Sequence, residues 1–156
     1  MKEKASSRIH YYENSQGPVI GTCSDKVIRE DGLYFRDING DGKLNTYKDW
    51  RKSPEERARA LAEDLSAEEK IGLLFLNSWK MGMEQEDKDF VDETGLLDEK
   101  PVEKGSSIFA TSSTVGTTET IKDWKVRTFI IRSNPKPDEL ADWINEMNSL
   151  AEEGEH

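Results

Sequence analysis

Cysteine and histidine are nearly absent from this sequence. Cys23 is the one cysteine, which excludes an internal disulfide and any cluster of thiolate ligands. A nucleophilic cysteine needs a neighbouring base, and both histidines, His10 and His156, lie near chain ends, so cysteine chemistry is disfavoured. Residues 1–8 carry charges with no apolar run after them, which argues against a signal peptide. Together these absences predict a cytoplasmic protein in a reducing compartment.

Long apolar runs and an excess of basic residues are also missing. The 156 residues include 32 acidic and 22 basic side chains, which gives a net charge of −10. Nucleic acids and anionic membranes attract basic surfaces, so this charge predicts neither as a partner. No apolar run is long enough to span a bilayer. The length fits one domain or a fragment, and the acidic excess is compatible with cation binding.

The sequence does contain a run of alternating oxygen donors that matches the first half of an EF-hand-type calcium loop. Asp37, Asn39 and Asp41 would point inward, and Gly42 would allow the sharp turn at the sixth position. The seventh residue of such a loop offers its backbone carbonyl, and the ninth acts directly or through water. An acid one place beyond the twelfth position completes the set. The predicted metal ligands are therefore Asp37, Asn39, Asp41, Lys43, Asn45 and Asp49.

Lys48 breaks the pattern at the twelfth position, where the motif has a bidentate Glu. Three side-chain oxygens and one carbonyl give four ligands, whereas calcium takes six to eight. We therefore expect weak calcium binding, with a Kd on the order of 10⁻⁴ M or poorer. The alternative is an ordinary solvated turn, because Asp, Asn and Gly are common turn residues.

The N-terminal third contains few regular patterns. Glycine and proline punctuate residues 1–31, which predicts an extended lead-in with little regular structure, lying on a partner surface. The apolar residues 32–36 then lead the chain into the loop and would anchor it.

Two capping boxes, at Ser53 and Ser66, predict consecutive helices that run to about Leu65 and about Trp79. Apolar residues recur at helical spacing within both. The first helix would present Ala58, Leu61, Ala62 and Leu65 on one face, and the second would bury Ile71, Leu74, Phe75 and Ser78.

The C-terminal half alternates acidic, polar and apolar stretches. Residues 81–104, dense in Asp and Glu, indicate a solvated linker, and residues 105–120 indicate a surface loop or edge strand. Residues 124–132 are β-branched and aromatic, which predicts a strand. An amphipathic helix over 137–151 follows, with Pro137 at its start.

These elements predict an α+β fragment that is mainly helical with few strands. Its parts would be an extended N-terminal lead-in (1–31), a calcium-loop-like segment (32–52), and a segment of helices with a strand and a following helix (53–156).

Several runs occur in an order that is typical of one enzyme family. They are GLYFRDINGDGKLN (32–45), YKDWR (47–51), SPEER (53–57), LSAEEKIGL (65–73), RTFIIR (127–132), NP (134–135) and ELADWIN (139–145). This order resembles the N-terminal region of family 3 glycoside hydrolases, which include the β-glucosidases. The resemblance covers most of residues 30–151.

The resemblance implies retaining hydrolysis of β-glycosides by two carboxylates, one a nucleophile and the other a general acid/base. In the family the nucleophile belongs to a Ser-Asp-Trp-type segment late in a (β/α)8 barrel. The Asp-Trp pairs here begin at Asp49, Asp123 and Asp142, and none follows a serine, so no residue of this chain is given a catalytic role. A barrel needs about 250 residues, so the chain resembles its lead-in helices and first β/α unit.

The leading hypothesis is an N-terminal fragment of a β-glucosidase-like enzyme, inactive alone, whose β-glycoside substrate would bind only the full-length protein. The alternative is a free-standing, calcium-stabilised binding or interaction module; a structural or regulatory remnant without a ligand is a third. A strand over 124–132 without its barrel neighbours has open edges, which predicts self-association or pairing with the missing barrel.

Overall fold

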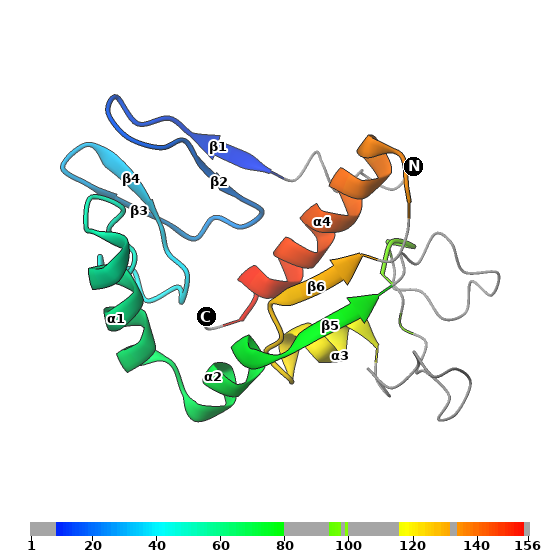
Figure 1. Ribbon diagram of the computed structural model, residues 1–156. Coiled ribbons are helices and arrows are strands. Elements are labelled where there is room, and N and C mark those ends of the chain that lie inside the picture. Colours follow the sequence, from blue (N-terminus) through cyan, green and yellow to red (C-terminus); the bar gives the residue numbers. More distant parts are fainter. Residues whose placement is uncertain (1–8, 80–93, 98, 100–115, 132–133, 155–156) are drawn as a thin grey trace.

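The computed structural model describes residues 9–79, 94–97, 99, 116–131 and 134–154. Two β-hairpins and a helix lie on one side of the molecule, and a parallel pair of strands with two further helices lies on the other (Figure 1).

The hairpins occupy a part of the chain for which the sequence predicts little regular structure. The first pairs β1 (His10–Tyr12) with β2 (Ile20–Thr22), and the second pairs β3 (Val27–Glu30) with β4 (Leu33–Arg36). Both are antiparallel. The expectation of an extended lead-in over residues 1–31 is therefore wrong for the residues that the structure describes.

A short turn explains the second hairpin. Asp31 and Gly32 have positive φ angles of 53° and 79°. Two consecutive positive φ angles are typical of a type I′ turn, whose twist matches that of the flanking strands and which favours Asp-Gly. Glu30 then pairs with Leu33, and the register continues to Val27 opposite Arg36.

Phe35 is the centre of packing on this side and is fully buried. Its ring stacks on that of Trp50, with centroids 5.4 Å apart. Trp50 also donates its indole N–H to the Tyr34 carbonyl at 2.9 Å. A Cβ at Gly17 would lie 2.3 Å from the Trp50 ring, so only glycine allows the chain to pass this close. The apolar run at 32–36 thus anchors the following loop, as predicted.

Both capping boxes are confirmed. α1 (Pro54–Asp64) begins after Ser53, whose hydroxyl accepts from the Glu56 N–H at 3.2 Å, while the Glu56 carboxylate accepts from the Ser53 N–H at 3.0 Å. The same pair of bonds begins α2 (Ala67–Leu74). Each box satisfies two backbone donors that the helix itself leaves unpaired.

The face predicted for the first helix is only partly inward. Leu65 is buried and Leu61 is half-buried, as expected, whereas Ala58 and Ala62 are exposed. No residue within α1 itself is fully buried. α1 is therefore a surface helix whose buried neighbour is Leu65, just after its C-terminal end.

The second helix is shorter than predicted. α2 ends at Leu74, and β5 (Leu76–Trp79), which includes Ser78, replaces its expected last turns. Ile71, Leu74 and Phe75, expected to be buried, are 55%, 85% and 59% exposed. The extended residues of β5 obtain their backbone hydrogen bonds from a second strand rather than from the helix.

α2 instead packs through its opposite side. Its buried residues are Glu69 and Gly72. A Cβ at Gly72 would lie 2.4 Å from the Lys125 carbonyl oxygen, so the absence of a side chain allows α2 to touch the backbone at Trp124 and Lys125. This contact orients the predicted apolar stripe outward.

The other side of the molecule is built on parallel strands. β5 pairs in parallel with β6 (Thr128–Ile131), and α3 (Thr117–Lys122) lies between them in the chain. α4 (Pro137–Glu152) follows β6, confirming the helix predicted to begin at Pro137 (Figure 1). Its inner face meets α3 in a hydrophobic core formed by Leu97, Ile121, Trp143 and Met147, with Phe129, Leu140, Leu150 and Ala151 around it.

Two further boundaries differ from the prediction. The strand expected over 124–132 begins at Thr128 instead, because Lys125 has a φ of 58°, which interrupts an extended chain. α3 includes residues 117–120, where a loop or edge strand is predicted. Most of the predicted linker at 81–104 lies outside the described residues.

The described chain is thus a small α+β structure of four helices and short strand pairs. None of its helices combines the length and apolar character needed to cross a membrane.

Candidate functional site

The calcium-like loop forms the connection between β4 and α1, and its backbone has the sharp turn that the motif predicts. Gly40 and Gly42 both have φ of 70°, a left-handed conformation that glycine adopts without strain. The Asp37 carboxylate accepts the Gly42 N–H at 2.9 Å, and the Asp41 carboxylate accepts the Lys43 N–H at 2.9 Å. The loop is therefore ordered by its own acids.

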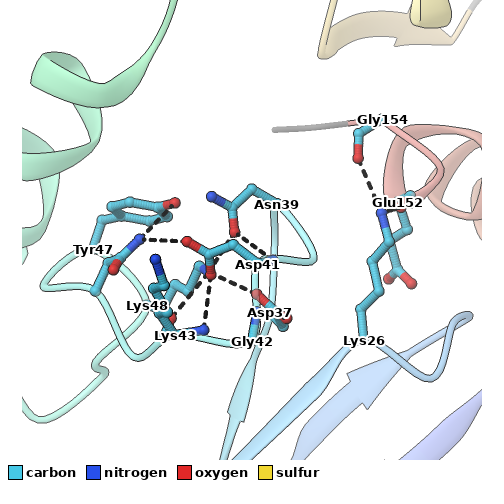
Figure 2. A network of polar contacts seen from close by, with 11 residues as sticks. Lys26, Asp37, Asn39, Asp41, Gly42, Lys43, Tyr47, Lys48, Glu152 and Gly154 are labelled. Carbon is cyan, nitrogen blue, oxygen red and sulfur yellow. Dashed lines mark hydrogen bonds and ion pairs between the residues drawn. The ribbon is translucent and has the colours of Figure 1, made fainter.

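The ammonium group of Lys48 lies among the oxygens that the sequence assigns to a metal. It donates to Asp37 Oδ1 at 2.6 Å, to Asp41 Oδ1 at 2.5 Å and to the Lys43 carbonyl at 3.1 Å. A further hydrogen bond reaches Asn39 Oδ1. Figure 2 shows these residues around the lysine side chain, which has no exposed surface.

The opposite charges of this ring act on each other. Burial alone would lower the pKa of the Lys48 ammonium, but its hydrogen bonds to Asp37 and Asp41 outweigh burial and raise that pKa. The hydrogen bond from Lys48 is the main reason that the pKa of the Asp41 carboxyl falls far below its usual range. Lys48 is therefore held protonated and Asp41 ionised at neutral pH.

Four of the six predicted ligands meet at this point, and two do not. The Asn45 side chain uses its amide N–H groups toward Asp41, at 3.3 Å, and toward the Tyr47 hydroxyl. Asp49 binds Arg51 instead, accepting from Nε at 2.8 Å and from Nη2 at 2.9 Å. That guanidinium lowers the pKa of the Asp49 carboxyl. Asp49 therefore does not replace the missing twelfth-position acid in this arrangement.

The loop is tied to elements far along the chain. The Asp37 N–H donates to the Lys26 carbonyl at 2.9 Å, and the methylene groups of Lys26 pass beside Gly40. The Lys26 ammonium reaches the C-terminal end of α4, where it donates to the carbonyls of Glu152 at 2.7 Å and Gly154 at 3.1 Å (Figure 2). A cation at this end complements the helix dipole.

Glu152 is a second polar junction, which the sequence reasoning missed. Its Oε2 accepts from the Thr22 hydroxyl at 2.6 Å and from the N–H groups of Cys23 and Ser24, both at 2.9 Å. Only the fold brings the first hairpin to the last turn of α4. No local pattern around Glu152 signals this role.

The loop brings oxygens of the kind that bind calcium together around a lysine nitrogen. Oxygens that suit calcium converge, but the position that the ion would fill contains an ammonium nitrogen. Within the described residues, no group of three or more His, Cys, Asp or Glu side chains is arranged to hold a metal. Calcium binding by this loop stays a prediction, and the free-standing calcium module has no supporting contact in the described part of the chain.

The three Asp-Trp pairs are dispersed. Asp49 is paired with Arg51, Asp123 caps the end of α3, and Asp142 lies within α4. A retaining glycosidase needs two carboxyl groups about 5–5.5 Å apart across the sugar bond. The structure gives no reason to assign a catalytic role to these residues.

Apolar side chains are exposed around the parallel strands. We call these residues the strand-pair surface: Leu74, Phe75, Leu76, Ile130 and Ile131. Their exposed fractions range from 36% to 85%. Large exposed apolar patches are typical of surfaces that contact another part of a protein or another chain.

One curated relative shares a segment with this chain. The periplasmic beta-glucosidase/beta-xylosidase of Dickeya chrysanthemi is 41% identical to it over 63 residues. The aligned segment covers 40% of this chain and 10% of the relative, so the chain matches about a tenth of that enzyme. No family model matches the sequence. The chain thus has a partial relationship to a glycoside hydrolase.

This comparison corrects the expected location. The sequence reasoning predicts a cytoplasmic protein, but the relative is a periplasmic enzyme. A chain with a single cysteine is compatible with the periplasm as well as with the cytoplasm.

Proposed function

We propose that this chain supplies an N-terminal part of a glycoside hydrolase of the β-glucosidase/β-xylosidase kind and resembles the family 3 enzymes. The 41% identity to the periplasmic enzyme over 63 residues is the observation that carries this proposal. In such a protein the chain would act in the periplasm, as the relative does.

The order of elements after α2 supports this role. β5, α3, β6 and α4 follow one another as strand, helix, strand and helix, and the two strands are parallel. Parallel strands connected through a helix are the repeating unit of α/β folds, including barrels. In the proposed protein they would be the first strands of a (β/α)8 barrel.

The strand-pair surface supports it independently. Fully burying a Leu, Ile or Phe side chain stabilises a protein by about 1.5–3 kcal/mol. Leu74, at 85% exposed, contributes almost none of this in the described structure. The rest of a barrel would cover these residues and pair the outer edges that β5 and β6 have in the described part of the chain.

In this proposal the chain has a supporting role and no catalytic one. Barrel enzymes assemble their sites from the ends of several strands, and two short parallel strands provide only a small part of that face. We expect no hydrolysis of aryl β-glucosides or β-xylosides by the purified chain alone. Turnover that follows the protein through purification would contradict this expectation.

A chimera tests the proposed relationship. The aligned 63 residues of the Dickeya chrysanthemi enzyme are exchanged for those of this chain, and hydrolysis of aryl β-glucoside and β-xyloside is measured. We expect a folded enzyme that retains activity with both substrates. A control chimera with the same residues in scrambled order should neither fold nor hydrolyse.

The proposal would be wrong if the chimera folded and remained inactive, or if it behaved like the scrambled control. Circular dichroism and size-exclusion chromatography separate these two results, because they report folding without activity.

A further inference from the structure

The loop at residues 37–48 has the shape of a calcium site and a cation of its own. We propose that the Lys48 ammonium is the structural cation of this loop, so that the loop folds without metal. One substitution, Lys48→Glu, should then convert it into a calcium site.

Hydrogen-bond capacity supports this inference. A lysine ammonium has three N–H donors and no acceptor. Lys48 meets four oxygens, from Asp37, Asn39, Asp41 and the Lys43 carbonyl, so all three donors are used and one N–H is shared between two oxygens. These are the first, third, fifth and seventh loop positions, which hold calcium in an EF-hand. The nitrogen therefore occupies the place of the ion and leaves no buried acid of the loop without a cation.

Charge balance supports it as well. Asp37 and Asp41 contribute −2 and Lys48 contributes +1, so the filled ring has a net charge of −1. With Lys48→Glu the ring would hold three carboxylates, at −3, and bound calcium would return it to −1. The variant without calcium would hold three like charges at close range, which strongly disfavours the loop.

The ligand count favours calcium in the variant alone. The native loop offers four oxygens, whereas calcium takes six to eight. A glutamate at position 48 would add two oxygens in the bidentate position of the motif, which gives six. Displacing Lys48 from the native loop would instead require moving a buried ammonium away from two carboxylates.

The consequence reaches beyond the loop. Asp37 and Gly40 contact Lys26, whose ammonium binds the C-terminal end of α4. A tethered cation keeps this connection independent of the calcium concentration around the protein.

The experiment compares the thermal unfolding of the full chain in EDTA and in calcium. The wild type should show the same Tm in both, and terbium luminescence and calorimetry should detect no tight binding. Lys48→Glu should have a lower Tm in EDTA, and millimolar calcium should raise it by about 5–10 °C, as expected for a ligand at about 100 times its Kd.

Two further variants make the result decisive. Lys52→Glu makes the same charge change at an exposed lysine outside the loop, and its Tm should not respond to calcium. Lys48→Gln removes the cation without adding a carboxylate, so it should lose stability and gain less from calcium than Lys48→Glu.

A wild type that calcium stabilises by several degrees would overturn the proposal, because the ammonium would then not be the resident cation. So would a Lys48→Glu variant that stays unfolded in calcium or folds without responding to it. A calcium response in Lys52→Glu as large as that in Lys48→Glu would have the same meaning.

Discussion

The loop at residues 37–48 and the strand-pair surface differ in whether their side chains find partners within the same segment. In the loop, buried charges find partners within twelve residues, so Lys48 and its acids form a closed set. At the strand pair, apolar side chains such as Leu74 and Phe75 stay in water. A segment can therefore complete its polar interactions locally while its apolar side chains still lack cover in the described part of the chain.

Removing the cation from the loop should give the largest effect. Lys48→Met keeps a side chain of similar length but leaves Asp37 and Asp41 facing each other without a positive charge. Breaking the buried Lys48–Asp37 ion pair costs about 3–5 kcal/mol, and most of the effect comes from Asp37 because the Asp41 side chain is 33% exposed. Urea unfolding should show a lower midpoint, whereas Lys52→Met, at an exposed position, should change stability by less than about 0.5 kcal/mol. Equal stability of the two variants would show that the ring contributes little.

Substitutions on the buried and exposed sides of α2 should differ in their effect on stability. Gly72→Ala should destabilise the fold by about 1–2 kcal/mol, because the new Cβ would meet the Lys125 carbonyl at 2.4 Å while alanine improves helix propensity only partly in compensation. Leu74→Ala, on the exposed side, should change stability by less than about 0.5 kcal/mol. Chemical unfolding of both variants measures the difference, and a larger loss for Leu74→Ala would reverse the assignment of inner and outer faces.

The pairing of Asp49 with Arg51 predicts a dependence on pH. Hydrogen bonds from Arg51 lower the pKa of Asp49 in the folded state. Its contribution is therefore present above the unfolded pKa of about 3.9 and is lost as the pH falls through the lower folded pKa. Asp49→Asn should cost about 1 kcal/mol at pH 7 and progressively less below about pH 4. Unfolding curves at both pH values test this.

The same pair predicts that Asp49 is not a ligand of the loop. Because its carboxylate is directed at Arg51, Asp49→Asn should leave the calcium response of the Lys48→Glu variant unchanged. Loss of that response would return Asp49 to the set of loop ligands.

The sequence predicts helix starts correctly where the residues that cause them lie within one turn of the start. The boxes at Ser53 and Ser66 and the proline at position 137 act within one helical turn, and all three helices begin where expected. Asp31-Gly32 is an equally local signal, because this dipeptide favours the type I′ turn of a hairpin.

The remaining differences have distant causes. Residues 76–79 are extended because they pair with 128–131, about fifty residues later, and no helical pattern in the segment can reveal that partner. Lys48 breaks the calcium motif when position is considered alone. Its role becomes clear only when the loop closes and places the ammonium among the acids.

Substitutions at the strand-pair surface should have the smallest effect on stability. They should have a large effect on self-association. We predict that the wild type self-associates at micromolar concentration, because β5 and β6 form a two-stranded sheet in the described part of the chain, beside exposed Leu74 and Phe75. The double variant Leu74→Lys/Phe75→Lys should be monomeric, since charges at such positions oppose pairing with another chain. Its urea midpoint should stay close to that of the wild type, because both side chains are mostly in water already.

Sedimentation velocity over a range of concentrations measures this directly. The double variant Tyr11→Lys/Val19→Lys is the matched control, because it adds the same two charges at residues 68% and 58% exposed in the first hairpin region, so it should leave association unaltered. Association that is lost equally in this control would point to a general charge effect rather than to the strand-pair surface. A wild type that sediments as one sharp monomer and unfolds cooperatively would mean that the described residues already satisfy their apolar surface, and the contrast between loop and strand pair would then fail.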